Sequence, residues 1–212
     1  MSNISAIIHI IDDDASFRTA IGDLLRACDY RVAHYESAAQ FLEKNPSDEP
    51  ACILLDVHMP GLSGPQLQDH LTGLGSELPI IFVTGDGDIP TSVQTIKSGA
   101  EDFLTKPIPK ERLLKAIERA LLHSVELRER SRRVAAMRSL VSRLTPREHE
   151  IFVLLARGWP HKKIAHSLGT SERTIKFHRH NLMEKLTVHS LAELSVVAER
   201  LGLLPGSSSN RN

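Results

Sequence analysis

The stretch Ile7-Ile8-His9-Ile10-Ile11-Asp12-Asp13-Asp14 begins with an almost continuously apolar run and ends in three carboxylates. A second apolar run, Ile80-Ile81-Phe82-Val83, ends in Thr84-Gly85. Such runs are typical of central strands in a parallel sheet, because helices cover both faces of that sheet. Both stretches therefore predict central strands with polar side chains just beyond their carboxyl ends.

The first 105 residues carry four or five such runs, separated by longer segments with helical period. Strands that alternate with helices imply βαβ crossovers and a parallel sheet. We therefore expect an α/β domain with a doubly wound sheet of five strands, followed by an all-α part. The predicted strands are Ala6–Ile11, Arg31–His34, Cys52–Leu55, Ile80–Val83 and Glu101–Thr105, and helices are predicted around Ala20–Leu25, Leu67–Leu74 and Val93–Lys97.

From Pro109 onward the sequence shows helical patterns. A long helix is expected to continue from Pro109 into the Arg-rich stretch 128–143, where a narrow apolar stripe favours either a short coiled coil or a solvated linker. Thr145-Pro146-Arg147-Glu148 then has the sequence of a capping box with proline at the first helical position. Four short helices are predicted near 146–157, 161–168, 172–186 and 191–201, and the tail 205–212 is predicted to be disordered.

Charge divides the chain in the same way. Residues 1–123 carry 10 Lys and Arg against 18 Asp and Glu, and residues 124–212 carry 16 against 8, although the formal net charge is zero. The acidic part suits a metal cation, and the basic part suits a polyanion. The sequence has no apolar stretch long enough for a membrane span and no signal-peptide pattern at its start. Cys28 and Cys52 lack metal-ligand spacing, so we expect a cytoplasmic protein with reduced thiols.

Polar side chains follow four of the predicted strands: Asp12–Asp14 the first, Asp56 the third, Thr84 the fourth and Lys106 the fifth. Ligands of open parallel sheets bind beyond the carboxyl ends of the strands, so the fold should bring these side chains together. Carboxylates at such short distances repel one another, and Mg²⁺ bound together with a phosphate would relieve this repulsion. Taken singly, the Asp run could cap a helix, and the other residues could lie in turns. Their joint placement on strand ends favours a phosphoryl site.

The chain at this point resembles the receiver domain of bacterial response regulators, over about residues 5–123. That resemblance implies a flavodoxin-like fold, Asp56 as the phosphoacceptor, and a cis bond before Pro107. Residues 85–90 look like the nitrogen-fixation-type (FixJ-like) subgroup, and Asp86 adds a negative charge near the pocket. The matching motifs are Ile11-Asp12-Asp13-Asp14, Leu54-Leu55-Asp56-Val57-His58-Met59-Pro60-Gly61, Val83-Thr84-Gly85 and Asp102-Phe103-Leu104-Thr105-Lys106-Pro107.

The same resemblance implies a role for the residues around Asp56. Thr84 and Lys106 would bind the phosphoryl group. Phe103 would be an aromatic switch that turns inward when Thr84 moves. The Mg²⁺ ligands would be Asp12, Asp13, Asp56 and the backbone carbonyl of His58.

The predicted helix 172–186 has one apolar face and one basic face. The expected core face is formed by Ile175, Leu182, Met183 and Leu186. The opposite face carries Arg173, Lys176, Phe177, Arg179, His180 and Lys185. A basic face with one apolar residue suits phosphate contacts and packing on a thymine methyl, although on an isolated helix such a face is more often simply solvated.

The surrounding sequence resembles the LuxR-type DNA-binding domain, over about residues 140–204. The resemblance rests on Leu144-Thr145-Pro146-Arg147-Glu148, on Lys163-Ile164-Ala165 and on matches from Thr174 to Leu186. It implies that Lys176, Phe177 and His180 face the major groove and that the last helix is a dimerisation surface. The implied phosphate contacts are Lys163, Thr174, Arg179 and Lys185. Trp159-Pro160-His161 departs from the small-polar-Asn stretch usual there, and Trp159 is expected to anchor a core or an interface rather than to read DNA.

These features predict a phosphorylation-dependent transcription factor of a two-component system, not an enzyme. A sensor histidine kinase would phosphorylate the receiver (5–123), which would act through a helical linker (124–143) on a helix-turn-helix domain (144–204). Homodimerisation, DNA binding and recruitment of RNA polymerase would follow. One alternative is a Mg²⁺-dependent phosphatase or phosphotransferase, disfavoured because His58 stands where such enzymes often have a second acid. Another is a phosphorylation-independent regulator, disfavoured by the intact pocket.

Overall fold

The computed structural model describes residues 6–44, 49–85 and 99–204. The helix predicted around Val93–Lys97, Asp86 and the tail 205–212 lie outside the described residues. The chain divides into two compact units, Met1–Arg128 and Glu129–Asn212. The division falls within one long helix, α5 (Lys110–Val141), which covers the helix predicted to start at Pro109.

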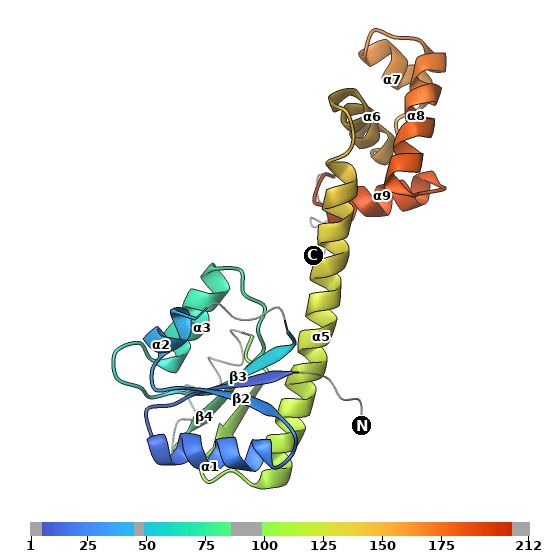
Figure 1. The fold of residues 1–212 in the computed structure, drawn as a ribbon. Helices are drawn as coiled ribbons and strands as arrows, with labels where there is room; N and C mark the ends of the chain where they lie inside the picture. The colour runs from blue at the N-terminus through green and yellow to red at the C-terminus, as the bar shows by residue number, and fades with distance from the viewer. Residues whose placement is uncertain (1–5, 45–48, 86–98, 205–212) are drawn as a thin grey trace, which may run out of the picture. The chain divides into compact units, whose positions relative to one another are not determined.

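The first unit is built on a parallel sheet of five strands in the order β2-β1-β3-β4-β5 (Figure 1). This is the strand order of flavodoxin-like folds, so the predicted doubly wound α/β fold is confirmed. All residues of β3 and β4 are buried, which accounts for the apolar runs that precede Asp56 and Thr84 at the ends of these strands. Both ends of each strand lie within one residue of the predicted position. The strands are β1 (Ile7–Ile11), β2 (Arg31–Tyr35), β3 (Ala51–Asp56), β4 (Ile80–Thr84) and β5 (Asp102–Thr105).

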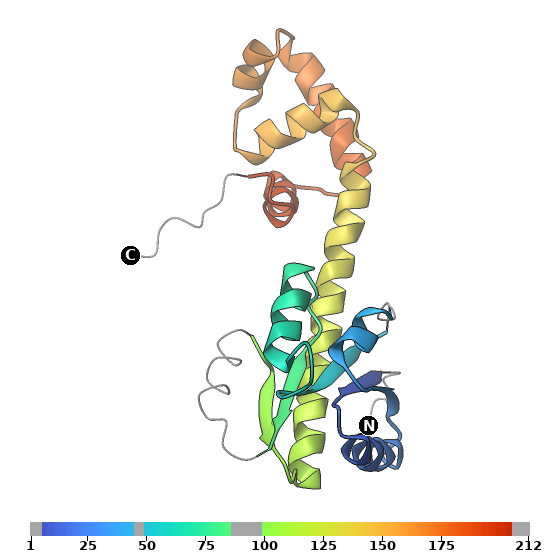
Figure 2. The ribbon, with the colours of Figure 1, turned by 90° about the vertical axis from the view of Figure 1, so that its left-hand side faces the viewer.

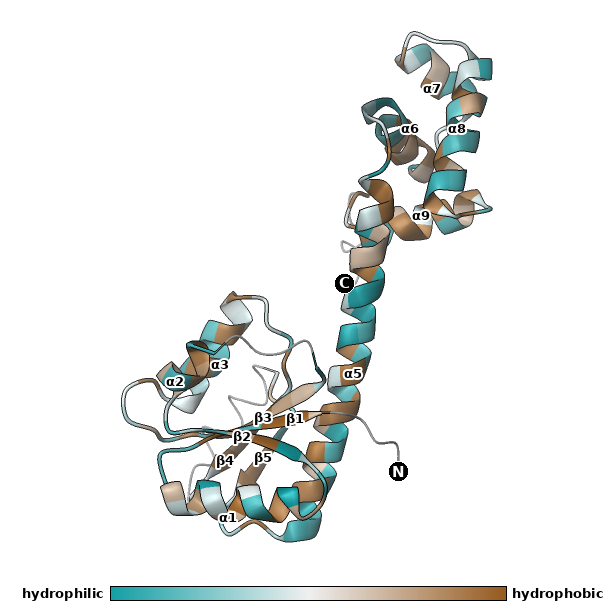
Figure 3. Ribbon diagram, viewed as in Figure 1, coloured by the Kyte–Doolittle hydropathy of each residue, from teal (hydrophilic) through white to brown (hydrophobic). Residues whose placement is uncertain are grey.

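Helices cover both faces of this sheet (Figure 1; Figure 2 shows α1 almost end-on). α1 (Ala15–Arg26) and the first part of α5 bury Leu25 and Ile117 against one face. α2 (Ala38–Leu42) and α3 (Gly64–Gly73) cover the other face, where Phe41 packs. The central strands are largely apolar, whereas the helices around them are mixed (Figure 3). α2 was not predicted, because five residues are too few to show a helical period.

The second unit contains four short helices together with the end of α5. α6 packs against α8 and α9, and α7 packs against α8. Phe152, Ile164, Leu182 and Leu194 bring one buried side chain from each helix into a common core. All four helices end within one residue of their predictions: α6 (Pro146–Ala156), α7 (His161–Ser167), α8 (Glu172–Leu186) and α9 (Leu191–Arg200).

The linker helix also contributes to this second core. Leu140 and Val141, from the predicted apolar stripe, pack against it as partly buried side chains. The capping box of Thr145 and Glu148 at the start of α6 is present as predicted. No described helix is both long and apolar enough to cross a membrane.

Candidate functional site

Three predicted site residues meet at the carboxyl edge of the sheet. The Nζ of Lys106 lies 2.7 Å from Asp12 Oδ2 and 2.8 Å from Asp56 Oδ1. The other oxygens of the two carboxylates accept hydrogen bonds from the backbone N–H groups of Asp14, at 2.9 Å, and His58, at 2.7 Å. Asp12 and Asp56 are only 1% and 6% exposed. Two buried negative charges therefore share one ammonium group.

The pKa values reflect this imbalance. Burial raises the pKa of Asp12 and the charge of Asp56 adds to the rise, while hydrogen bonds from Lys106 and the Asp14 N–H oppose it. Burial alone would lower the pKa of Lys106, but its hydrogen bonds and charge interactions with Asp12 and Asp56 raise it. Lys106 is therefore held as a cation beside a carboxylate pair that it neutralises only in part, and such a site favours a further cation.

The remaining predicted pocket residues border this group. Thr84 is buried at the end of β4, and its carbonyl accepts a hydrogen bond from the Lys106 N–H at 2.7 Å. Asp13 is exposed. Phe103 is half-buried, with its ring centroid 6.5 Å from that of Phe82. The peptide bond between Lys106 and Pro107 is cis, as predicted.

Helix α1 contributes two residues to the pocket that were not predicted. The Phe17 ring lies under the Lys106 ammonium, with 4.1 Å between Nζ and the ring centroid. Arg18 Nη1 donates to the backbone carbonyl of Asp12 at 2.6 Å. Asp14 is the N-cap of α1, so the helix-cap interpretation holds for this member of the Asp run. That cap was the signal that places Phe17 and Arg18 in the first turn, next to Asp12.

Gly64 is a third residue that was not predicted. It begins α3 so close to β3 that an added Cβ would lie 2.3 Å from the carbonyl oxygen of Asp56 and 3.0 Å from the Phe82 ring. A side chain there would push α3 away from Asp56. The sequence gives no signal for this contact beyond the capping box of Ser63 that precedes it.

In the second unit, α8 presents the predicted basic face. The predicted core residues Ile175, Leu182 and Leu186 are buried, and Met183 packs partly against them. Phe177 is 61% exposed, which is unusual for an aromatic side chain. Of the other residues on this face, Arg173, Lys176 and His180 are exposed and Arg179 is half-buried. Thr174, a predicted phosphate contact, is also half-buried.

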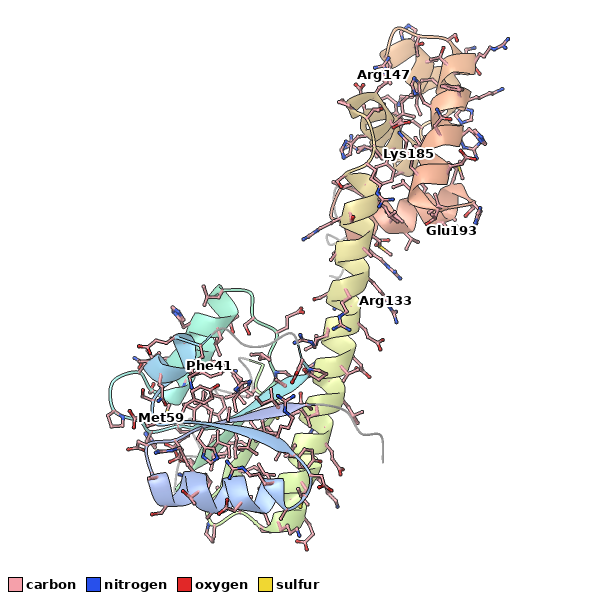
Figure 4. The ribbon with its side chains drawn as sticks, in the orientation of Figure 1. Phe41, Met59, Arg133, Arg147, Lys185 and Glu193 are labelled. Atoms are coloured by element: carbon pink, nitrogen blue, oxygen red, sulfur yellow. The ribbon has the colours of Figure 1, made fainter. Side chains whose placement is uncertain are left out.

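Three of the predicted phosphate contacts, Lys185, Lys163 and Thr174, have partners inside the unit, and the Thr174 hydroxyl lies 2.9 Å from Ser171 Oγ. Lys185 Nζ donates to Glu148 Oε2 at 2.6 Å, and Glu148 also accepts from the N–H and hydroxyl of Thr145. Burial alone would raise the pKa of Glu148, but these hydrogen bonds outweigh it and lower that pKa. Lys185 therefore completes an internal ion pair and is the least available of the predicted contacts (labelled in Figure 4). Lys163 is exposed, and its Nζ lies 3.8 Å from the centroid of the Trp159 ring.

Two family models match the two units. The response regulator receiver domain matches residues 8–118, and the LuxR family of bacterial regulatory proteins matches residues 142–198. The chain is a response regulator with a LuxR-type DNA-binding domain.

Relatives of this response regulator align over nearly the whole chain. Nodulation protein W of Bradyrhizobium diazoefficiens is 39% identical over 202 residues, covering 95% of this chain and 89% of that protein. TodT of Pseudomonas putida is 40% identical over 201 residues, covering 95% and 88%. The transcriptional regulator FixJ of B. diazoefficiens is 38% identical over 198 residues, covering 93% and 96%, which agrees with the predicted subgroup.

Solved structures give the same result. The response regulator StyR aligns with 92% of this chain and 99% of its own at 40% identity, with a TM-score of 0.77. Full-length FixJ from B. japonicum aligns with 94% and 98% at 35% identity, with a TM-score of 0.56. The family consists of transcriptional regulators and not of enzymes, which decides against the phosphatase alternative.

Receiver domains of response regulators generally bind Mg²⁺ at the phosphorylation site. The donor set here fits that ion, because Asp12 and Asp56 supply buried oxygen ligands with an uncompensated charge. Within the described ranges, no three acidic, histidine or cysteine side chains stand close enough together to hold a metal ion by themselves. Asp12, Asp13 and Asp56 are therefore not gathered into a cluster of three ligands in this structure, and the predicted set of Mg²⁺ ligands stays a prediction.

Proposed function

We propose that this response regulator accepts a phosphoryl group on Asp56 from a sensor histidine kinase, and that the phosphorylated receiver promotes homodimerisation and DNA binding. The observation that carries the proposal is the geometry of Asp56. One of its oxygens is fixed by the His58 N–H, and the other faces the Lys106 ammonium beside a second buried carboxylate. This arrangement orients an oxygen for attack and supplies a cation for the product.

In the transfer, an Asp56 oxygen forms a bond to phosphorus while the bond from phosphorus to the kinase's histidine nitrogen breaks. The nitrogen keeps the electron pair of the broken bond. Lys106 then pairs with a phosphoryl oxygen, and the Thr84 hydroxyl donates to another. Mg²⁺ would neutralise charge on the transferring oxygens, and its ligands would be Asp12, Asp13, Asp56 and the backbone carbonyl of His58.

The switch starts from the hydroxyl of Thr84. When that hydroxyl moves toward the phosphoryl group, it leaves room for the half-buried Phe103 ring to turn inward. A change of about 3 kcal/mol in a two-state equilibrium shifts the populations more than a hundredfold. The receiver (5–123) transmits this change through the linker (124–143) to the DNA-binding domain (144–204).

On DNA, Lys176, Phe177 and His180 face the major groove as the exposed part of α8. Two copies that dimerise through α9 read half-sites about one helical turn apart. The dimer recruits RNA polymerase, and the protein acts in the cytoplasm, where DNA is accessible to it. Lys163, Thr174 and Arg179 contact phosphates, and Lys185 does so after leaving Glu148.

The test is to treat the full chain with acetyl phosphate and Mg²⁺ and to measure its mass and oligomeric state. The native chain should gain one phosphoryl group and form dimers, and Asp56→Asn should do neither. Asp69→Asn, which alters an exposed acid on α3, should behave as the native chain. A native chain that stays unmodified, or that is modified without changing its assembly, would contradict the proposal.

A further inference from the structure

The motif Trp159-Pro160-His161 departs from the family pattern and has no part in the function proposed above. Trp159 is the one tryptophan of the sequence. Its backbone N–H donates to the Leu154 carbonyl at 3.1 Å, across the turn made by Gly158 with φ +77°. Its ring is half-buried and packs against the core of the second unit. Backbone and core together fix the position of this ring.

Lys163 lies in the first turn of α7, two residues after this motif. Its backbone N–H donates to the Pro160 carbonyl at 2.9 Å, and its Nζ lies 3.8 Å from the centroid of the Trp159 ring. The negative face of an indole attracts an ammonium group and is the best of the aromatic side chains for this contact. An ammonium has three N–H donors, so Lys163 can rest on the ring and still donate toward solvent.

The surroundings of this pair are cationic. Burial lowers the pKa of His161, and the nearby charges of Arg179 and Lys176 lower it further, while Glu172 opposes them. Because α7 packs against α8, the first turn of α7 lies near the cationic side chains of Lys176 and Arg179. None of the ion pairs in the described part of the second unit involves Lys163. An exposed cation on a rigid ring, beside further cations, fits a polyanion.

We infer that Trp159 is a positioning residue for DNA binding, because its ring holds Lys163 where the ammonium contacts a backbone phosphate. The inference rests on the proposed DNA-binding function and adds to it a residue that acts through Lys163. Phosphate contacts carry no sequence information, so the effect is expected on a DNA duplex of any sequence.

A double-mutant cycle in the full chain tests this role. Affinity for a mixed-sequence DNA duplex is measured for the native chain, Trp159→Leu, Lys163→Gln and the double variant, before and after acetyl phosphate treatment. Trp159→Leu should weaken binding by about two- to fivefold, and Trp159→Phe by less, because a phenyl ring attracts a cation more weakly. Lys163→Gln should reduce the slope of log affinity against log salt by about 0.9, as expected for one lost phosphate contact.

The decisive comparison is the effect of Trp159→Leu in chains that carry different residues at positions 162 and 163. Trp159→Leu should have no further effect once Lys163 is glutamine, and it should keep its full effect in Lys162→Gln, which removes the neighbouring exposed lysine of the same turn. Equal weakening in the Lys163→Gln background would make Trp159 a structural residue and overturn the inference. So would a Trp159→Leu variant that binds as tightly as the native chain. A native chain that binds no duplex under either condition would overturn the proposed function as well.

Discussion

Each unit of the molecule contains a lysine that donates to a buried carboxylate, yet the two groups are balanced differently. Lys106 stands between Asp12 and Asp56, with N–O distances of 2.7 and 2.8 Å. Lys185 pairs with one carboxylate, that of Glu148, at 2.6 Å. The first group holds two negative charges against one positive charge, and the second holds one of each.

The hydrogen bonds around the two groups do not explain this contrast in charge. Glu148 accepts from Lys185 and from the backbone N–H and hydroxyl of Thr145, all at Oε2. In the first group, both oxygens of Asp12 and of Asp56 accept a hydrogen bond. The Asp12 and Asp56 carboxylates lie at strand ends, where their excess negative charge favours the binding of another cation together with a phosphoryl group. Burial and a short ion pair therefore do not distinguish a functional site from a structural one, whereas an unbalanced charge does.

Removing the lysine from the unbalanced group should have the largest effect on stability. Lys106→Met leaves two buried carboxylates unpaired, so we expect the first unit to lose about 3–4 kcal/mol in the presence of EDTA. Mg²⁺ should restore part of this loss, because it replaces the missing positive charge. Urea unfolding with EDTA and with Mg²⁺ measures both effects. Lys115→Met, at an exposed position on α5, serves as the control, and equal stability of the two variants would refute the prediction.

Lowering the pH should destabilise the first unit more than the second. Burial lowers the pKa of His9 in β1 from 6.5 to about 4, so the folded first unit favours the neutral ring. Stability from this group is fully present above pH 6.5 and is lost as the pH falls toward 4, by about 3 kcal/mol. In the second unit the shifts are smaller: the lowered pKa of His161 costs some stability below pH 6.5, and the contribution of Glu148, whose pKa is also lowered, is lost below its ordinary value of 4.5.

Unfolding measured at a series of pH values checks this order. His9→Leu should remove most of the loss between pH 6.5 and 4 and leave the second unit unchanged. A smaller loss should remain, because burial and the nearby charges of Arg26 and Arg18 also lower the pKa of His34. A His9→Leu variant whose first unit keeps the native pH dependence in that window would show that another group is responsible.

The close approach of α3 to the unbalanced group should make Gly64→Ala harmful. The added Cβ would lie 2.3 Å from the Asp56 carbonyl oxygen, so we expect a loss of about 2 kcal/mol and slower phosphorylation by acetyl phosphate. Gly73→Ala in the same helix is the matched control, because nothing lies within 4 Å of its added Cβ. Similar behaviour of the two variants in thermal unfolding and phosphorylation would show that the contact is unimportant.

The balanced group should give the smallest effect. Lys185→Met should destabilise the second unit by about 1–2 kcal/mol, because Glu148 keeps its hydrogen bonds from Thr145 and the lysine is partly exposed. Phosphorylation of Asp56 should be unaffected. Lys176→Met, at an exposed position on the same helix, should leave stability unchanged. A Lys185→Met variant that unfolds as the native chain does would show that the pair with Glu148 does not stabilise the second unit.

The sequence predicted the sheet and the helices wherever a local pattern was strong. The run Ile7–Ile11 and the capping box at Thr145 are local signals, and both elements were predicted within one residue. Contacts between distant residues were harder to predict. Lys185 looked like part of a basic face, because helical periodicity cannot show that Glu148 lies beneath it.

The candidate pocket shows the same limit. Asp12, Asp56 and Lys106 were predicted to meet, since the carboxyl ends of parallel strands share one edge of the sheet. Phe17 and Gly64 were missed, because their contacts depend on how closely α1 and α3 approach that edge. No periodicity or motif in the sequence reports that distance.

The most direct test of the account is the affinity of the full chain for a DNA duplex before and after phosphorylation, at fixed salt. The unbalanced charge at Asp56 predicts that acetyl phosphate with Mg²⁺ raises the affinity of the native chain by about tenfold or more and leaves Asp56→Asn unchanged. Equal affinity before and after treatment, in a chain whose mass shows the added phosphoryl group, would contradict the account and favour a phosphorylation-independent regulator.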